Sequence, residues 1–541
     1  MPSRMKNLDD YRQQRVSFRW ESPEMFNFGK DVVDAWGKSH PDKTAIHWVG
    51  QDTERIITFA EISARTNQVA QALIELGLQP GDRVLVILPR VVAWWESLVG
   101  IFKAGLVALP GTSLLTSSDL SYRTQIAEVA AVITDATGAE RIDEIHDDLP
   151  SLKHRILVGP ERNGWQHYEA LVNAASATFE PGDTRSDAPA LIYFTSGTTG
   201  MPKMVLHTHA SYGIGHQVTG RFWLDLTEND LHWNISDTGW AKAAWSSLFG
   251  PWICGASLFV QHTVGRFEPQ DVLTLLEKYP VTTMCSAPTI YRLLVQQDLD
   301  TFQPAALRHC VAAGEPLNPE VIDVWRKATG LEIRDGYGQT ESVLLCGNFP
   351  GVDVKPGSMG LPTPGIDLAV VDDEGHRLAP GEEGQIAVRV EPDRPLGLFR
   401  EYWKSPEETA EVFRHGWYYT CDCATIDEDG YFWFVGRSDD VITSSAYRIG
   451  PFEVENALLE HPAVVEAAVV GKKDAVRGEI VRAFVVLAAA YQGRQDLETE
   501  LQDHVKRVTA PYKYPRQIEF VDELPKTISG KIRRLELRQR K

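Results

Sequence analysis

The pattern of apolar and polar positions alternates between short apolar runs and amphipathic stretches from about residue 40 onward. Apolar runs with β-branched residues stand at positions 83–88, 130–134, 190–195 and 309–314. Runs of this kind, separated by helical patterns, predict the buried strands of an α/β domain. Ligands of such sheets bind beyond the carboxyl ends of the strands, so the loops after Thr195, Ala313 and Asp335 are the predicted binding region.

The C-terminal part of the chain has shorter elements. Asp427–Gly430 precedes an aromatic run, which predicts a hairpin. Beyond Asp440, strand patterns at 464–470, 482–487 and 517–521 alternate with helical patterns at 453–459 and 497–507. This order predicts a smaller α+β domain after a short hinge, with residues 1–438 in the first domain and 439–541 in the second.

Composition narrows the classes of function. A chain of 541 residues with 43% hydrophobic content is long enough for more than one core, because single cores stop growing at roughly 250–300 residues. The net charge of -20 argues against a broad nucleic-acid surface, so an anionic ligand must be held by a few focused cations.

The cysteines and the apolar runs bear on the compartment. Six scattered cysteines form no disulfide framework, and Cys421 and Cys423 lack a second pair at metal-ligand spacing. The N-terminus is basic but no apolar secretory segment follows, and no apolar run approaches the roughly 20 residues of a membrane helix. These features predict a cytoplasmic protein.

The stretch Thr195-Ser-Gly-Thr-Thr-Gly-Met-Pro-Lys203 carries the first recognisable chemistry. Its glycines let the backbone approach a phosphate chain, its hydroxyls donate hydrogen bonds, and Lys203 adds a positive charge. It is not a Walker A loop, because Gly-x4-Gly-Lys-[Ser/Thr] is absent. A polar turn without a ligand is the alternative, but the full string resembles the phosphate loop of the adenylate-forming superfamily, which includes acyl-CoA synthetases, adenylation domains and luciferases.

Further strings typical of that superfamily follow in order, and together they span the chain from about residue 40 to Arg534. The resemblance implies a large N-terminal adenylate-forming α/β domain with parallel-rich sheets and a smaller mobile C-terminal α+β domain, with a hinge at Asp439. It implies that Lys531, Thr340 and Glu341 are catalytic, that Glu341 binds Mg²⁺, and that Asp422, with Arg437 as its partner, accepts hydrogen bonds from the ribose. The implied ATP-binding residues are Thr195, Ser196, Gly197, Thr198, Thr199, Gly200, Lys203, Gly314, Glu315, Pro316, Asp335, Gly336, Tyr337, Gly338, Gln339, Thr340, Asp422, Arg437 and Lys531.

Within the superfamily the chain is most similar to the medium-chain acyl-CoA synthetases. The similarity lies in the stretches 235–240, 444–451 and 508–515. It implies that Trp240 lines the acyl pocket, with medium-chain or aromatic acids as the implied substrates. The implied coenzyme A path consists of Ser445, Ala446, Tyr447, Arg448, Arg477, Lys506 and Tyr514.

The implied reaction joins a carboxylic acid to ATP, with Mg²⁺, and then passes the acyl group to coenzyme A. No general base is required, because the acid already reacts as its carboxylate. Ala446 and Cys421 stand where the superfamily usually has glycine. Acylation of Lys531 by a lysine acyltransferase, reversed by a deacylase, is a further hypothesis, because it would remove the charge. Two alternatives stay open: a different acceptor such as a carrier protein, and a non-catalytic nucleotide or acyl-metabolite sensor.

Overall fold

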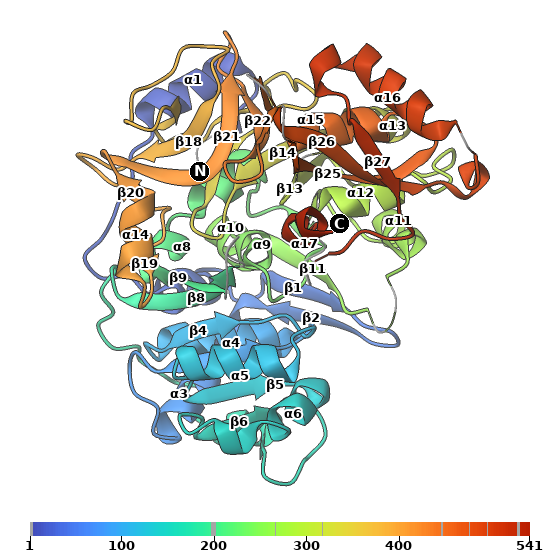
Figure 1. Cartoon of the computed structure of the whole chain (residues 1–541). Coiled ribbons are helices and arrows are strands. Elements are labelled where there is room, and N and C mark those ends of the chain that lie inside the picture. The colour runs from blue at the N-terminus through green and yellow to red at the C-terminus, as the bar shows by residue number, and fades with distance from the viewer. Residues whose placement is uncertain are drawn as a thin grey trace.

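The structure is a computed structural model that describes residues 4–540, except 196–201, 264, 266, 316, 445–446, 475–476, 495 and 527–530, and only the backbone of Arg448. Its elements confirm the predicted α/β class (Figure 1). The strands at the apolar runs of the sequence form where they were expected, and the aromatic run after Gly430 pairs with the preceding strand as an antiparallel hairpin.

The first sheet has the strand order β16-β15-β14-β13-β12-β10-β11-β1-β2, and its strands from β1 through β14 run parallel along that path. Its strands are β1 (Thr44–Val49), β2 (Glu54–Thr58), β10 (Leu231–Asn234), β11 (Ser257–Gln261), β12 (Thr283–Ser286), β13 (His309–Ala313), β14 (Ile333–Gly338), β15 (Leu344–Gly347) and β16 (Leu361–Pro362). β14 includes Asp335, so the loop expected directly after Asp335 begins only after Gly338. This corrects the predicted end of the strand.

The second sheet has the order β19-β9-β8-β4-β3-β5-β6-β7, parallel from β8 to β7 and antiparallel at β8, β9 and β19. Its strands are β3 (Arg83–Ile87), β4 (Val107–Pro110), β5 (Ala131–Thr134), β6 (His154–Leu157), β7 (Gln166–His167), β8 (Pro189–Thr195), β9 (Lys203–Thr208) and β19 (Glu401–Tyr402). The third sheet is antiparallel and contains β17 (Leu368–Val371), β18 (Gly384–Arg389), β20 (Phe413–Arg414), β21 (Trp417–Ile426) and β22 (Phe432–Arg437).

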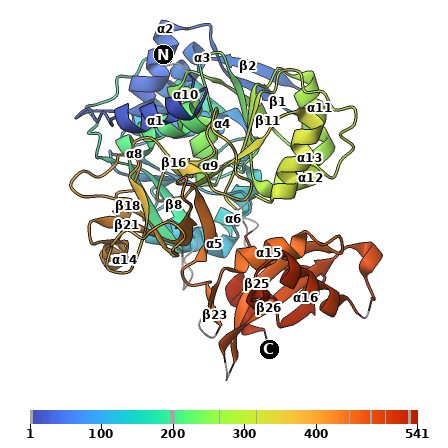
Figure 2. The same cartoon turned by 90° about the horizontal axis from the view of Figure 1, so that it is seen from above.

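The C-terminal domain is built on a fourth sheet and lies to one side of the rest of the molecule (Figure 2). Its strands are β23 (Ile442–Ser444), β24 (Tyr447–Ile449), β25 (Val464–Asp474), β26 (Gly478–Leu487) and β27 (Gln517–Phe520). The third sheet ends at Arg437 and the fourth begins at Ile442, and the domain boundary at residues 438 and 439 stays a prediction within that interval.

Helices cover the sheets, and three π-helical turns interrupt the regular pattern at Gly29–Asp34, Thr219–Trp223 and Trp245–Phe249. The α-helices are α1 (Leu8–Ser17), α2 (Ala35–Ser39), α3 (Phe59–Glu75), α4 (Val92–Lys103), α5 (Ser117–Ile126), α6 (Ala136–Asp143), α7 (Tyr168–Ala174), α8 (His209–Gly213), α9 (Ala241–Ala244), α10 (Gly250–Ile253), α11 (Pro269–Lys278), α12 (Pro288–Leu294), α13 (Pro319–Thr329), α14 (Pro406–Val412), α15 (Pro451–Leu459), α16 (Leu497–Val508) and α17 (Arg534–Gln539). In the part of the chain that is described, none of them is both long and apolar enough to span a bilayer.

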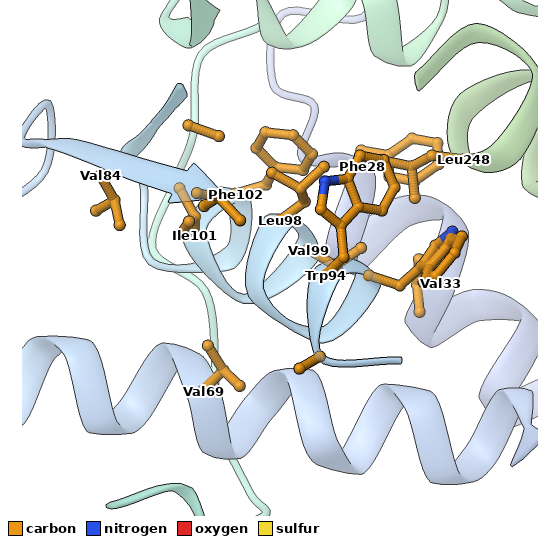
Figure 3. Close-up of a cluster of buried hydrophobic side chains, with 14 of the residues drawn as sticks. Phe28, Val33, Val69, Val84, Trp94, Leu98, Val99, Ile101, Phe102 and Leu248 are labelled. Atoms are coloured by element: carbon orange, nitrogen blue, oxygen red, sulfur yellow. The ribbon is translucent and has the colours of Figure 1, made fainter. Parts of the chain in front are cut away.

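Helix α4 forms the centre of the largest apolar cluster, and every one of its residues is buried. Figure 3 shows Trp94, Leu98 and Phe102 of this helix packed toward Phe28 and Leu248. A Cβ at Gly100 would lie 2.5 Å from a methyl group of Val69 in α3, so the glycine permits close contact between the two helices. Each buried side chain of this size contributes roughly 1.5–3 kcal/mol, so the cluster stabilises the packing around α4.

Candidate active site

Two strand ends bring the residues of the first motif together. β8 and β9 are antiparallel, and Thr195 lies opposite Lys203, so the paired ends of the two strands flank positions 196–202. Ser196, Gly197, Thr198, Thr199 and Gly200 lie outside the described residues. The Lys203 ammonium contacts the Glu408 carboxylate at 3.1 Å and lies 5.0 Å from the centre of the Tyr402 ring.

The loop after β13 requires a glycine at its first position. Gly314 has a φ of 109°, which a residue with a side chain rarely adopts. The next residue, Glu315, accepts hydrogen bonds from Thr289 and from Arg292, whose Nη2 lies 3.3 Å from the carboxylate. Glu315 therefore anchors the loop to α12, and Pro316 lies outside the described residues.

A lysine that the sequence analysis did not single out lies beside this loop. Lys242 Nζ donates to the Ala313 carbonyl oxygen at 2.9 Å, directly before Gly314. Burial lowers the pKa of Lys242, while the Cys285 thiol and the carboxyl groups of Glu315 and Asp335 act in the opposite direction. A partly desolvated cation thus faces the end of β13.

Asp335 is buried within β14 and accepts a hydrogen bond from the Gly336 amide at 2.9 Å. Burial raises the pKa of Asp335 to about 8, although the amide groups of Gly336 and Leu317 oppose the rise. This carboxyl group is therefore largely protonated at neutral pH.

Asp422 is the point where three separate strands meet. One of its carboxylate oxygens accepts from the Tyr337 hydroxyl at 2.5 Å and from the Gln339 amide at 2.6 Å. Arg437 reaches the other oxygen at 3.4 Å. Burial raises the pKa of Asp422, and the charge of Arg437 is the largest influence against that rise. The structure thus brings together Asp422, Arg437 and the 335–341 string, whose part in ATP binding stays a prediction.

The neighbouring Thr340 and Glu341 are held from several sides. The Thr340 carbonyl accepts from His207 Nε2 and from the Tyr212 hydroxyl, each at 2.8 Å. Burial lowers the pKa of His207 to about 3, so the ring is neutral and its proton is on Nε2, because a carbonyl oxygen can only accept. Glu341 is buried, and its carboxylate accepts from the Tyr402 hydroxyl at 2.9 Å.

Lys531 comes from the C-terminal domain, and its charge reaches this site. Burial raises the pKa of Glu341, whereas the Tyr402 hydrogen bond and the charges of Arg437 and Lys531 lower it. The same lysine also lowers the pKa of Asp422 and of Lys242. Lys531 is therefore within electrostatic range of Glu341, Asp422 and Lys242 in the present arrangement of the domains.

The predicted hinge is connected to the site through Arg437. Its Nε lies 3.8 Å from the carboxylate of Asp439, an exposed residue, while its Nη1 contacts Asp422. From the other side, Arg538 of α17 donates to the Asp439 carbonyl oxygen at 2.9 Å. The segment at residue 439 is thus held from both domains, and its action as a hinge stays a prediction.

The predicted coenzyme A residues lie on the C-terminal domain. Tyr447 is half exposed and stacks on Tyr512 with ring centres 4.1 Å apart. Lys506 Nζ lies 4.4 Å from the centre of the Tyr514 ring, and Arg477 is exposed. Ser445 and Ala446 lie outside the described residues, as does the side chain of Arg448. Among the described members of this set, Tyr447 and Arg477 are exposed, whereas Lys506 and Tyr514 are partly buried.

Trp240 directly precedes α9 and is partly buried. The preceding residue, Gly239, lies close to the backbone of Thr112, because a Cβ on Gly239 would lie 1.9 Å from the backbone nitrogen of Thr112. The loop that carries Trp240 therefore packs against the end of β4 without space for a side chain. That Trp240 lines the acyl pocket stays a prediction.

Cys421 has a φ of 59°, in the left-handed region where glycine is favoured. It precedes Asp422 in a part of β21 where the register against β18 shifts. The departure from glycine noted in the sequence is therefore a position of backbone strain. None of the six cysteines, all of which the structure describes, is joined in a disulfide bond.

Family models match most of the chain. The model described as AMP-binding enzyme covers residues 33–403, and the model described as AMP-binding enzyme C-terminal domain covers residues 453–531. The chain belongs to the AMP-binding enzyme family. These matches confirm the superfamily inferred from the sequence motifs.

Curated relatives of this AMP-binding enzyme are acyl-coenzyme A synthetases. Mouse acyl-coenzyme A synthetase ACSM3, mitochondrial, is 49% identical over 548 residues, covering 99% of this chain and 94% of its own length. Human acyl-coenzyme A synthetase ACSM4, mitochondrial, is 48% identical over 526 residues, covering 95% of this chain and 90% of its own length. The similarity to acyl-CoA synthetases predicted from the three short stretches is confirmed.

Solved structures of two aryl-CoA ligases have the same fold. The anthranilate CoA ligase AuaEII, in complex with anthranoyl-AMP, superposes with a TM-score of 0.87 at 32% identity, covering 95% of this chain and 97% of that one. A benzoate CoA ligase from Burkholderia xenovorans LB400 has a TM-score of 0.84 at 30% identity, covering 95% of this chain and all of the other. The AMP-binding enzyme described here is thus an acid–thiol ligase in type.

The predicted cytoplasmic location is contradicted, because the curated relatives are named as mitochondrial. The prediction was based on the scattered thiols and the missing secretory pattern. Those features separate a reducing compartment from an oxidising one, but they do not distinguish between two reducing compartments.

Proposed function

We propose that this protein is an AMP-forming acyl-CoA synthetase of fatty acid metabolism that activates medium-chain or related carboxylic acids. The observation that carries the proposal is that four distant segments of the chain act on two buried carboxyl groups, Asp422 and Glu341. Tyr337 and Gln339, Asp422 itself, Arg437, and the charge of Lys531 from the other domain all act around Asp422 and Glu341. A site of this construction is suited to hold a nucleotide and to stabilise charge at its phosphates.

In the first half-reaction the substrate carboxylate attacks the α-phosphorus of ATP, which forms the acyl-adenylate and releases pyrophosphate. Both reactants are anions, so the chain must reduce their repulsion, and Lys203, Arg437 and Lys531 supply positive charge for this purpose. The substrate acid is already ionised at neutral pH, so no side chain has to remove a proton from it.

A magnesium ion fits the oxygen donors of this site. Among the described residues no group of three or more His, Cys, Asp or Glu side chains could enclose a metal. Mg²⁺ does not need such a group, because it is usually held by one or two carboxylates together with substrate phosphates. Glu341 would hold it, and the bound ion would neutralise charge on the phosphates.

In the second half-reaction the thiol of coenzyme A attacks the acyl carbon of the adenylate, which forms the thioester, releases AMP and gives up the thiol proton to solvent. Of the predicted coenzyme A residues, Tyr447 is exposed, and Lys506 lies beside the partly buried ring of Tyr514. Rotation of the C-terminal domain at Asp439 would bring this set to the site and withdraw Lys531. Ala446, in place of the usual glycine, would narrow the path of the pantetheine, so we expect Ala446→Gly to accelerate the coenzyme A step selectively.

The acyl chain is proposed from the relatives and from Trp240. The curated relatives are acyl-CoA synthetases, and the two solved structures are ligases of anthranilate and benzoate. If Trp240 lines the acyl pocket as predicted, its partly buried indole would suit an apolar chain or an aryl ring. A carrier protein as acceptor is the second candidate, and the test below separates it from coenzyme A.

Lys531 is also a candidate point of regulation. Its side chain is exposed, and its charge acts on Glu341 and Asp422. Acylation of the amine by a lysine acyltransferase would remove that charge and stop adenylation, and a deacylase would restore it.

The test is AMP release by the purified protein with ATP and Mg²⁺, across aliphatic acids from acetate to dodecanoate and a set of aryl acids, with and without coenzyme A. We expect release that depends on both the acid and coenzyme A. Acid-dependent pyrophosphate exchange with no AMP release on adding coenzyme A would favour a carrier protein as the acceptor. Absence of both activities with every acid would contradict the proposed function.

A further inference from the structure

A short segment connects the two halves of the candidate site. The Phe399 amide donates to the Glu341 carbonyl oxygen at 2.7 Å, and the Trp403 amide donates to the Met204 carbonyl oxygen at 2.8 Å. Between these points, β19 pairs with β9, placing Tyr402 opposite Val205. The backbone around Tyr402 is therefore fixed to the strand of Lys203 on one side and to Glu341 on the other.

The side chain of Tyr402 contacts a functional group at each end. Its hydroxyl donates to Glu341 Oε1 at 2.9 Å, and the centre of its ring lies 5.0 Å from Lys203 Nζ. The ring is only 7% exposed and packs on Phe399, with ring centres 4.8 Å apart. Tyr402 has little freedom to move away from either group.

Neither contact is needed for packing alone. A phenylalanine would fill the same space. The chain instead places the Tyr402 hydroxyl against the buried carboxylate of Glu341, and a carboxylate that has lost its hydration is costly to bury without a hydrogen-bond donor. The ring face also presents negative charge density to the ammonium group of Lys203. Glu408 contacts that ammonium as well, at 3.1 Å, so Lys203 is held between an aromatic face and an acid.

We propose that Tyr402 is a positioning residue that sets the placement of both Lys203 and Glu341, the first through its ring and the second through its hydroxyl. The inference depends on the proposed function, in which these two residues act on the phosphates of ATP. Its distinctive consequence is that the two effects are separable, because Tyr402→Phe removes only the hydroxyl and Tyr402→Leu removes the ring as well.

The test measures two quantities for each variant: ATP affinity by calorimetry, in EDTA and then with Mg²⁺, and the maximal rate of acid-dependent ATP–pyrophosphate exchange. We expect Tyr402→Phe to keep the affinity in EDTA within about twofold, because the ring still faces Lys203. It should reduce the gain in affinity on adding Mg²⁺, and reduce the exchange rate roughly tenfold, because Glu341 loses its donor. Tyr402→Leu should also weaken binding in EDTA about threefold.

A matched control and a double-mutant cycle distinguish positioning from packing. Tyr419 is another buried tyrosine, whose hydroxyl lies 3.5 Å from the carbonyl oxygen of Asp372, outside the site, and we expect Tyr419→Phe to change neither quantity. In a Glu341→Gln background, adding Tyr402→Phe should change the exchange rate by no more than about twofold, because the first substitution has already altered the contact between the Tyr402 hydroxyl and the Glu341 carboxylate.

The results separate a positioning role of Tyr402 from a role in packing alone. Exchange by Tyr402→Phe at the wild-type rate, or an equal loss in the Glu341→Gln background, would overturn the positioning role. If Tyr402→Leu does not fold, the Phe variant and the cycle still decide the role of the hydroxyl. If the wild-type protein shows no acid-dependent exchange, the proposed function fails instead, and the affinities in EDTA and Mg²⁺ still test whether Tyr402 positions the two residues.

Discussion

Replacing Asp335 by asparagine tests the most perturbed carboxyl group of the site. Burial raises the pKa of Asp335 to about 8, so the folded protein holds a proton that the unfolded chain releases above about pH 4. An asparagine has the size of the protonated acid and can still accept from the Gly336 amide, but it does not titrate. We expect Asp335→Asn to be more stable than the wild type at neutral pH.

The magnitude follows from proton linkage. Between about pH 4 and pH 8 the free energy of unfolding of the wild type loses about 1.4 kcal/mol per pH unit through this group, because the unfolded state binds one proton fewer. The variant has no such loss. The difference in the free energy of unfolding between the variant and the wild type should therefore grow by roughly 3 kcal/mol from pH 6 to pH 8 and level off above that.

The assay is denaturant unfolding followed by tryptophan fluorescence at several pH values. All fifteen tryptophans precede residue 439, so the signal reports the large N-terminal part alone. The same substitution at an exposed position, Asp52→Asn, provides the matched control. If the free energy of unfolding depends on pH in the same way for the wild type and Asp335→Asn between pH 6 and pH 8, the reasoning is refuted, because Asp335 would then be ionised in the folded protein.

Three further predictions concern the same site. Cys421→Gly should be more stable than Cys421→Ala by about 1 kcal/mol, because only glycine adopts a positive φ freely. This is the reverse of the usual order of the two residues. Equal stability of the two variants in denaturant unfolding would contradict the backbone strain at this position. His207→Gln, which can still donate to the Thr340 carbonyl, should keep the rate of pyrophosphate exchange, and His207→Leu should lose about tenfold; equal rates would exclude this role. Lys531→Gln should abolish adenylation but form thioester from preformed acyl-adenylate, and equal loss in both assays would reject a separate role in the first step.

The sequence predicted the parts of the fold that depend on local patterns. The runs at 83–88 and 190–195 became β3 and β8 because an apolar run between turn residues has few alternatives in an α/β domain. The strings at 195–203 and 335–341 could be singled out because each concentrates polar groups in a few consecutive residues, and their part in ATP binding stays a prediction. The end of β14 was placed too early, because a glycine-rich string reads as a loop although here it continues the strand to Gly338.

The remaining site residues depend on tertiary contacts that leave no local signal. Tyr402 lies 61 positions from Glu341, and Lys242 lies 71 positions from Ala313, so neither contact could be inferred from spacing. The protonated state of Asp335 has the same origin, because a carboxylate beside glycines looks solvated until the fold covers it. The compartment was predicted wrongly because composition reports redox conditions and not an organelle.

The position of Lys531 has a consequence for the direction of the reaction. Its charge acts on Asp422 and Glu341 in the present arrangement, and a group that lowers the barrier to adenylation lowers the barrier to the reverse reaction equally. If Lys531 promotes adenylation as proposed, pyrophosphate can regenerate ATP from the adenylate while the lysine stays in place. If the proposed rotation withdraws the lysine, the reverse barrier rises and the adenylate is kinetically trapped until a thiol arrives. The same movement that admits coenzyme A would then make the first step irreversible on the timescale of the second, without any energy source beyond the ATP already consumed.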